Sequence, residues 1–272
     1  MNSKEKTQAL KEIIASKGSM LISYSGGVDS ALLAVLATEV LGNNTRCILL
    51  DSPVVPRAAV AEARQIAEEF GLQMEIIPVR VMDDERFLKN PVDRCYWCKK
   101  KSAKVLKWRK DALHYACIAD GINVSDTGEH RPGLLASTED GICHPFLEAG
   151  ITKADIREIA HECGLQFWDK PSDACLASRI PYGDEITYTK LARVEEAEAF
   201  LHTNGFSPCR VRLHGSIARI EVVNDDLPKL LAMQDRLVTT IKTIGFTYVT
   251  LDLEGYRSGS MDEVLTRGEQ PQ

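Results

Sequence analysis

The sequence predicts an α/β protein in which a doubly wound parallel sheet is followed by a smaller C-terminal α+β module. Short runs of strand-forming residues alternate with helix-like stretches over about the first 120 residues, which is typical of parallel β-α units. The first run ends in a Gly-Gly turn that leads directly into a helical pattern. After residue 187 the pattern changes to a long helix and a hairpin-like pair. We therefore expect two domains, over residues 1–184 and 185–272.

In the first domain, strands and helices are expected to alternate. Strands are predicted over 19–24, 45–50, 74–79 and 116–119, and helices over 3–15, 31–37, 56–70, up to about 115, and 152–164. The segment 145–150 is expected to be a short linker. Ligands of such sheets bind at the carboxyl ends of the strands, so the loops that follow the strands are candidate sites.

The second domain is expected to be a small module of about 85 residues, which is within normal domain size. Its predicted elements are helices over 187–204 and 227–244, a hairpin around Val211 and 218–223, and a strand over 248–253. Between the domains, residues 170–183 form an irregular loop that carries Cys175 and Arg179.

The composition is that of an ordinary globular protein. With 272 residues, of which 44% are apolar and 26% charged, the chain can bury one large or two moderate cores. A net charge of −6 argues against broad adhesion to nucleic acid or to membranes. The N-terminal residues include no apolar targeting segment, and no apolar run approaches the roughly 20 residues that span a bilayer. We therefore expect a cytoplasmic protein.

The loop after the first strand is predicted to bind phosphate. It contains Ser25, Gly26, Gly27, Asp29 and Ser30, between a strand and a helix N-terminus. The glycines let backbone N–H groups approach an anion, and the serines can add hydroxyl donors. A carboxylate beside phosphate requires a cation, so we expect Mg²⁺ at the aspartate. The spacing excludes a Walker-type loop, and the alternative is a Gly-Gly turn capped by the aspartate.

A second polar loop follows the strand over 116–119 and is expected to face the first across the crevice. In this loop, Asp126 or Glu129 could provide a second metal contact, and Arg131 could face phosphate. The alternative is a solvated polar loop without a function.

Three of the eight cysteines are candidates for chemistry. Cys95 and Cys98 form a C-x-x-C pair, and Cys175 stands alone in its loop. A four-ligand zinc site lacks its other two ligands, and a redox dithiol normally follows the first strand of its own fold. Three thiolates can instead hold three irons of a 4Fe-4S cluster and leave the fourth iron open. The other five are interpreted as structural: Cys47, Cys117, Cys143, Cys163 and Cys209.

Three arginines are candidate anion ligands. Arg179, four residues after Cys175, could clamp a phosphate or carboxylate, or could form a surface ion pair. Arg210 and Arg212 lie two apart on a predicted strand, so they share a face and could form an anion clamp. The alternative for this pair is a solvated sheet face.

Taken together, these segments resemble one family. The loop Ser25 to Ser30 resembles the PP-loop of the ATP pyrophosphatase superfamily, whose members cleave ATP between the α- and β-phosphates. The complete set is similar to the LarE-type sulfur transferases of nickel-pincer nucleotide biosynthesis. Its other members are the Arg-Cys-Tyr-x-Cys-Lys segment, the Asp-Gly-x-Asn loop that ends in Arg-Pro-Gly, the loop around Cys175, Arg210-Val211-Arg212-x-His214, and Tyr256-Arg257-Ser258-Gly259.

This resemblance implies a two-step reaction on a small nucleotide. ATP adenylylates a carboxylate of pyridinium-3,5-biscarboxylic acid mononucleotide, and sulfur then displaces AMP to give a thiocarboxylate. It implies Asp29, Cys175 and Arg179 as catalytic residues, with Arg257 among the nucleotide ligands. It also implies metal or oligomer contacts at Glu198 and Asp235, and a homo-oligomer that is a trimer or a hexamer. The expected cofactors are ATP, Mg²⁺ and a 4Fe-4S cluster.

The sulfur source has two alternatives within the family. Some members surrender the sulfur of a cysteine at the position of Cys175, whereas others hold a 4Fe-4S cluster on three cysteines. Because Cys95 and Cys98 are also present, we expect the cluster version, in which a labile sulfide is transferred.

Two other functions fit parts of the pattern. A tRNA thiolase of the same superfamily would require a basic RNA-binding surface, which this acidic chain does not predict. An iron-sulfur redox sensor that merely binds nucleotide would have little use for an adenylylating loop.

Overall fold

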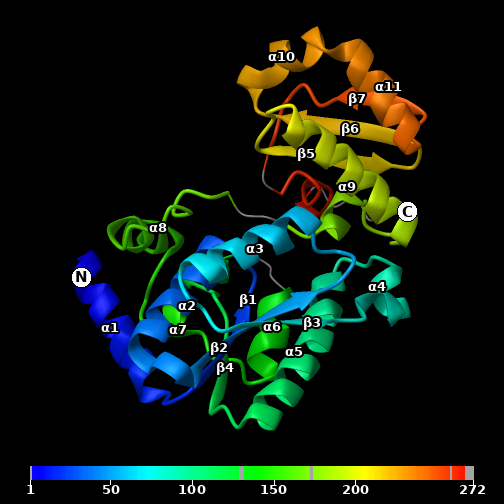
Figure 1. Cartoon of the computed structure of the whole chain (residues 1–272). Helices are drawn as coiled ribbons and strands as arrows, with labels where there is room; N and C mark the ends of the chain where they lie inside the picture. Colours follow the sequence, from blue (N-terminus) through cyan, green and yellow to red (C-terminus); the bar gives the residue numbers. More distant parts are fainter. Residues whose placement is uncertain (1, 129–131, 172–173, 258, 267–272) are drawn as a thin grey trace. The chain divides into compact units, whose positions relative to one another are not determined.

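The computed structural model describes residues 2–128, 132–171, 174–257 and 259–266 (Figure 1). The chain packs into two compact units, of which the first comprises Met1–Asp83 and Asp93–Asp173. The second comprises Asp84–Val92 and Ala174–Gln272. The division by packing therefore places the loop around Cys175 with the C-terminal module, whereas the expected boundary at residue 184 followed the change in sequence pattern.

The first unit is built on a four-stranded parallel sheet. Its strands are β1 (Met20–Tyr24), β2 (Thr45–Asp51), β3 (Met74–Pro78) and β4 (Cys117–Ala119), in the order β3-β2-β1-β4. Ile22 on β1 is in register with Cys47 on β2 and with Ala119 on β4. Because the strand order reverses between β1 and β4, the loops after these two strands flank the ligand crevice expected for this fold. The predicted doubly wound α/β architecture is confirmed.

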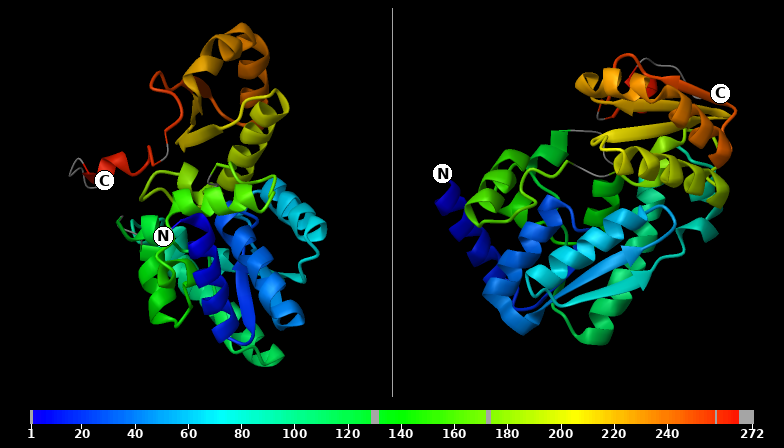
Figure 2. Two further views of the ribbon diagram at one scale, coloured as in Figure 1. Left: turned by 90° about the vertical axis from the view of Figure 1, so that its left-hand side faces the viewer. Right: turned by 45° about the horizontal axis from the view of Figure 1, so that its top comes forward.

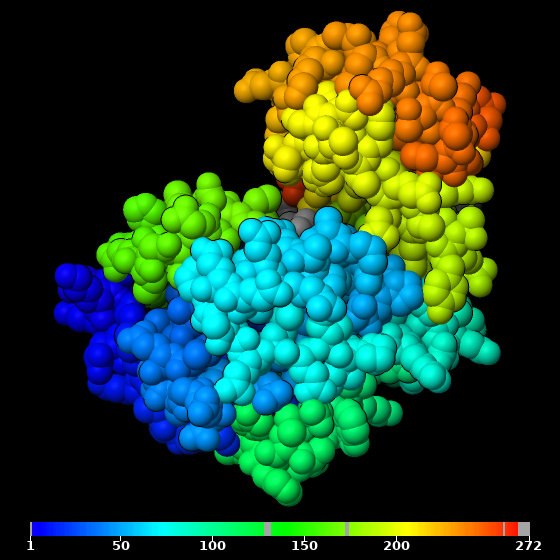
Figure 3. Space-filling model, viewed as in Figure 1, coloured from blue at the N-terminus to red at the C-terminus, as the bar shows by residue number. Residues whose placement is uncertain are grey.

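Helices cover both faces of this sheet (Figures 1 and 2). They are α1 (Ser3–Ser16), α2 (Val28–Leu41), α3 (Arg57–Glu69), α5 (Arg94–Leu113), α6 (Pro132–Glu139), α7 (Pro145–Glu148) and α8 (Lys153–Glu162), with 3₁₀ turns η1 (Gly42–Asn44), η2 (Val81–Asp83) and η3 (Val124–Gly128). Alternate side chains of the central strand feed two separate cores, Ile22 on one face and Leu21 on the other. Helix α1 lies at the surface of the unit (dark blue, Figure 3).

Three local predictions need correction. The expected linker 145–150 contains helix α7, which begins with Pro145, a residue well suited to the first helical position. Helix α6 lies in a stretch that was expected to remain a loop. The single helix expected over 227–244 is broken at Met233 into α10 (Leu227–Ala232) and α11 (Gln234–Ile244).

The second unit contains a mixed three-stranded sheet. Its strands are β5 (Cys209–His214), β6 (Ile217–Val222) and β7 (Tyr248–Leu251), with β5 antiparallel and β7 parallel to β6. Its other elements are α4 (Glu85–Leu88), η4 (Leu176–Arg179), α9 (Tyr188–Thr203), η5 (Asn224–Asp226) and α12 (Glu263–Thr266). The α9, β5 and β6 segments follow the sequence prediction closely.

The short segment 84–92 is held to the second unit by hydrogen bonds. The backbone N–H groups of Gly183 and Ile186 donate to the carbonyl oxygens of Asn90 and Leu88, at 2.9 and 2.8 Å. The Asn90 amide donates in turn to the carbonyl oxygens of Ile180 and Pro181. Nothing in the local sequence pattern indicates such contacts, because they join residues about 90 positions apart.

In the part of the chain that the structure describes, no helix has the length and apolar character needed to cross a membrane.

Candidate active site

The loop between β1 and α2 has the geometry of an anion site. Gly27 is the N-cap residue of α2 and has no side chain to occupy the N–H groups of the first turn, which leaves them available to an anion. Gly26 has φ +74°, and a Cβ on it would lie 2.6 Å from Cβ of Ala63 on α3. Only glycine therefore fits this turn.

The two serines of the loop bond to each other and to its backbone. The hydroxyl oxygens of Ser25 and Ser30 are 3.0 Å apart, and Ser30 Oγ accepts from the Ser25 N–H at 3.1 Å. Ser30 Oγ also lies 3.2 Å from the Gly27 carbonyl oxygen, to which it can donate. These hydroxyl groups therefore shape the loop in this structure, which is a role in addition to the predicted one of phosphate donors.

Asp29 is paired with a lysine that the sequence analysis missed. Lys153 Nζ lies 2.6 Å from Asp29 Oδ1, although the two residues are 124 positions apart. Burial raises the pKa of the Asp29 carboxyl, and Lys153 opposes this shift. Lys153 is the first residue of α8, where the helix dipole disfavours a cation, and this unfavourable placement was the available signal of a special role.

The loop after β4 packs directly onto the phosphate loop. A Cβ on Gly121 would lie 2.9 Å from Cβ of Asp29 and 3.0 Å from the backbone nitrogen of Ser30. The prediction that these two loops face each other is therefore confirmed, and Gly121 is the residue that permits their close approach. Asp126, in η3, lies close enough for its charge to raise the pKa of Asp29 further.

The carboxylate of Asp126 is also part of the loop framework, since its Oδ2 accepts from the Asn123 N–H at 3.0 Å. Glu129 and Arg131, which the sequence analysis assigned to metal and phosphate, lie outside the described residues.

Asp120 and His144 form a buried pair at the start of this loop. His144 Nδ1 and Asp120 Oδ1 are 2.7 Å apart, and the same oxygen accepts from the Ile122 N–H at 3.2 Å. The carboxylate thereby fixes the turn that carries Gly121. The sequence analysis missed this pair because its members belong to different segments.

Cys95 and Cys98 lie three residues apart near the start of α5, so their side chains share one face of the helix. Cys95 is exposed and Cys98 is partly buried. Gly133 of α6 packs beside them, since a Cβ there would lie 3.3 Å from Lys99 Cγ and 4.0 Å from Cys95 Cβ. Two thiols on one helix face can serve as two ligands of one metal group.

Cys175 belongs to the second unit and immediately precedes η4. The nearby Arg179 is 1% exposed, and its guanidinium forms a two-point ion pair with Glu198 at 2.9 and 3.0 Å. The surface ion pair considered for Arg179 is thus wrong, because both side chains are buried. Glu198 was expected on an exposed face, whereas Asp235 is exposed as expected.

Arg210 and Arg212 share one face of β5, as predicted, but this face is not solvated. Each residue is 5% exposed. Arg212 bonds to Glu221 Oε2 at 2.9 Å and to Ser260 Oγ at 3.1 Å, while the Arg210 guanidinium lies over the Tyr256 ring at 5.3 Å.

Arg257, by contrast, lies nearer the surface and pairs with Glu254 and Glu263 at 2.9 and 3.1 Å. Within each unit, the described residues form no group of three or more His, Cys, Asp or Glu side chains that could hold a metal.

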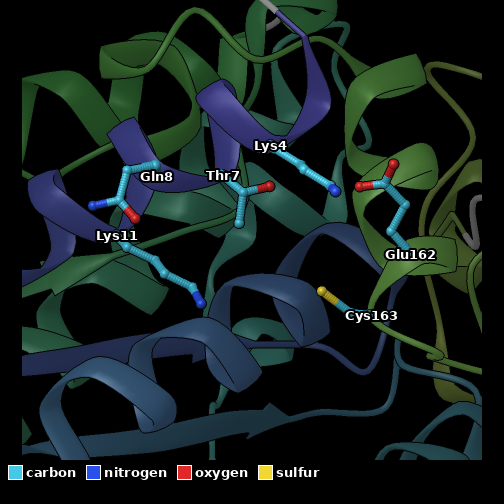
Figure 4. Close-up of a pocket in the computed structure, with 6 residues that line it drawn as sticks. All are labelled: Lys4, Thr7, Gln8, Lys11, Glu162 and Cys163. Carbon is cyan, nitrogen blue, oxygen red and sulfur yellow. The ribbon is translucent and has the colours of Figure 1, made fainter.

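The remaining cysteines differ in burial. Cys47 and Cys209 are buried, and burial raises the pKa of the Cys47 thiol to about 12. Cys117 and Cys143 are partly buried. Cys163 is exposed in a surface hollow between α1 and the end of α8 (Figure 4), so its interpretation as a core filler is wrong. None of the candidate site residues lines this hollow.

Comparison with known proteins identifies the family. The NAD synthase family model matches residues 3–94, which include the phosphate loop. The chain is 34% identical over 249 residues to the pyridinium-3,5-bisthiocarboxylic acid mononucleotide synthase of Lactiplantibacillus plantarum, covering 91% of this chain and 90% of that protein. An uncharacterized protein of Synechocystis is 40% identical over 266 residues, covering 96% of this chain and 98% of its own.

More distant similarity reaches the glutamine-hydrolyzing GMP synthase of Thermoplasma acidophilum, one polypeptide of which is 28% identical over 197 residues, covering 66% of this chain and 62% of that polypeptide. The long match to the Lactiplantibacillus enzyme, together with the phosphate loop and its Asp29–Lys153 pair, sets the family. The chain belongs to the LarE-like sulfur transferases of the PP-loop ATP pyrophosphatase superfamily.

Proposed function

We propose that this enzyme adenylylates a carboxylate of pyridinium-3,5-biscarboxylic acid mononucleotide with ATP and converts it to a thiocarboxylate. The observation that carries the proposal is a phosphate loop whose Asp29 pairs with Lys153, in a chain that matches the bisthiocarboxylic acid synthase over nearly its whole length. The product named for that relative contains the thiocarboxylate groups that the proposed reaction would make.

In the first step, the N–H groups at the start of α2 bind the phosphates of ATP, and the substrate carboxylate attacks the α-phosphorus. The bond from the α-phosphorus to the bridging oxygen breaks, and pyrophosphate leaves. Asp29 and Asp126 would hold Mg²⁺ beside the phosphates, since hard carboxylate oxygens suit this ion. Lys153 would exchange its bond to Asp29 for one to the departing pyrophosphate, whose charge it stabilises.

In the second step, a sulfur nucleophile attacks the acyl carbon and AMP leaves. Cys95, Cys98 and Cys175 would hold a 4Fe-4S cluster, which when bound leaves one iron open to carry a sulfide. The pair on one helix face supports two of these ligands. The alternative is that Cys175 gives up its own sulfur and becomes dehydroalanine, and the two sources differ in which cysteines are essential.

Arg210, Arg212 and Arg257 would recognise the substrate's phosphate and second carboxylate, since arginine binds such anions at two points. Arg212 already bonds to Glu221 in this structure, so an anion would have to share or replace this partner. We further propose that the protein assembles as a homo-oligomer, a trimer or a hexamer.

Product analysis with the purified protein tests the proposal. Incubation with Mg-ATP and the pyridinium dicarboxylate mononucleotide should release AMP and pyrophosphate in equal amounts and, with a sulfur source, a thiocarboxylate detected by mass spectrometry. Release of ADP as the stoichiometric product would contradict the PP-loop chemistry. AMP release without any sulfur-containing product would contradict the second step only. Salt-dependent retention and thiolation of tRNA would instead favour the RNA-modifying alternative.

A further inference from the structure

The backbone that carries Cys175 is held by a single buried guanidinium. Arg179 Nη1 donates to the carbonyl oxygen of Ala174, to that of Cys175 at 2.9 Å, and to Ser178 Oγ at 3.1 Å. The other side of the same guanidinium pairs with Glu198 on α9. Arg179 therefore connects the Cys175 segment to the main helix of the second unit.

The Cys175 carbonyl oxygen is bonded more heavily than a typical loop carbonyl. Besides Arg179 Nη1, it accepts from the Ser178 N–H at 3.0 Å and from Ser178 Oγ at 2.8 Å. At the other end of η4, Arg212 Nη1 donates to the Ser178 carbonyl oxygen at 3.2 Å. The backbone is thus fixed at both ends of this short turn, while the Cys175 thiol itself remains partly exposed.

Glu198 is in turn fixed by the sheet. Its Oε1 accepts from the Val211 N–H of β5 at 2.9 Å as well as from Arg179 Nε. Both charged side chains are buried, at 1% and 6% exposure. Burying an ion pair gains little stability compared with an apolar pair of the same volume, so its presence calls for another explanation.

We infer that Arg179 and Glu198 are positioning residues, which hold the Cys175 backbone in one conformation so that its sulfur is presented correctly. This inference rests on the proposed function only in giving Cys175 a part in sulfur transfer. It differs from the expectation that Arg179 clamps the substrate, because the guanidinium contacts found here are made with the protein. Arginine suits this task, since its planar fork of five N–H donors serves a carboxylate and carbonyl groups at once.

Amide hydrogen exchange of the free protein tests the inference without any substrate. Arg179→Lys keeps the charge but cannot reach Glu198 and both carbonyl groups together. The peptide over 174–180, which includes the Ser178 N–H, should exchange roughly tenfold to hundredfold faster, as expected for the loss of charge-assisted hydrogen bonds. Peptides of β5 and β6 should keep their exchange rates. Arg236→Lys, an exposed arginine on α11, is the matched control and should change neither.

A second variant separates positioning from folding. Arg179→Met alone leaves the buried Glu198 charge without its main partner, and this variant can fail to fold. In the double variant Arg179→Met with Glu198→Gln, no charge of the pair remains, and the glutamine oxygen can still accept from the Val211 N–H. We expect the double variant to recover its thermal midpoint while the 174–180 peptide continues to exchange rapidly.

The kinetic pattern provides an independent check on active enzyme. A positioning role lowers kcat for thiocarboxylate formation in Arg179→Lys and leaves KM for the nucleotide substrate unchanged. Wild-type exchange over 174–180 in Arg179→Lys, or a raised KM with unchanged kcat, would overturn the inference and return Arg179 to the role of substrate ligand. Because the exchange measurement requires no turnover, failure of the proposed reaction would leave it decisive.

Discussion

The contact between Gly121 and the phosphate loop allows a sharp test of the site. A Cβ at this position would meet Asp29 Cβ at 2.9 Å and the Ser30 nitrogen at 3.0 Å, and neither atom can move aside without moving the loop. Over-packing of this kind costs about 1–3 kcal/mol. A shift of about 1 Å in a catalytic group costs roughly 100-fold in rate. We therefore expect Gly121→Ala to fold and to lose about 100-fold in kcat/KM for AMP and pyrophosphate formation.

The control must lose similar stability away from the site. Gly71 has φ +61° and open space around its Cβ position, so Gly71→Ala costs about 1 kcal/mol through backbone strain alone. Both variants should show a lowered thermal midpoint, whereas only Gly121→Ala should lose activity in a pyrophosphate-release assay. If Gly121→Ala turns over at the wild-type rate, the loop after β4 does not hold Asp29 in place, and the assignment of Gly121 to the site is wrong.

Three further outcomes are expected from the same geometry. Asp29→Asn should abolish Mg²⁺-dependent AMP formation. Because burial raises the carboxyl pKa, the ionised form destabilises the fold as pH rises through that pKa, so the variant should also have a higher thermal midpoint than wild type at neutral pH; an unchanged rate of AMP release, or a lower midpoint, would contradict this. Lys153→Met should lower kcat about 100-fold in the pyrophosphate-release assay, an expectation that wild-type kcat would refute. Replacing any one of Cys95, Cys98 and Cys175 by Ala should remove iron and sulfide from anaerobically purified protein, whereas loss of sulfur-transfer activity at Cys175 alone, with no iron in the wild type, would support the sacrificial alternative.

The local parts of the site could be predicted from the sequence. A strand, a Gly-Gly turn and a helix follow each other without interruption around Ser25, and each is specified by neighbouring residues. The loop after β4 could be placed beside it because the carboxyl ends of adjacent parallel strands share one edge of the sheet. Arg210 and Arg212 share a face because side chains on a strand alternate.

Other features depend on contacts between distant segments and could not be predicted in this way. Helix α7 is only one turn long, so its stability comes from packing, which local propensity does not report. Arg179 was expected at the surface, as charged residues usually are, and only the fold brings Glu198 to it on α9. Lys153 reaches Asp29 across 124 residues, and the sequence indicates only that a lysine at a helix start is badly placed.

The two units divide the residues by chemical task. Asp29, Lys153 and Gly121 all belong to the first unit, so the groups assigned to ATP lie on one sheet edge. Cys175 and the arginines of β5 belong to the second. In the proposed reaction, adenylylation therefore draws its phosphate-handling groups from one unit, whereas sulfur transfer depends on residues of both. A segment that must present sulfur to an adenylate made elsewhere gains from a fixed backbone, because flexibility there would reduce the fraction of productive encounters. The buried Arg179–Glu198 pair provides that rigidity at the one cysteine of the three that lies outside the first unit.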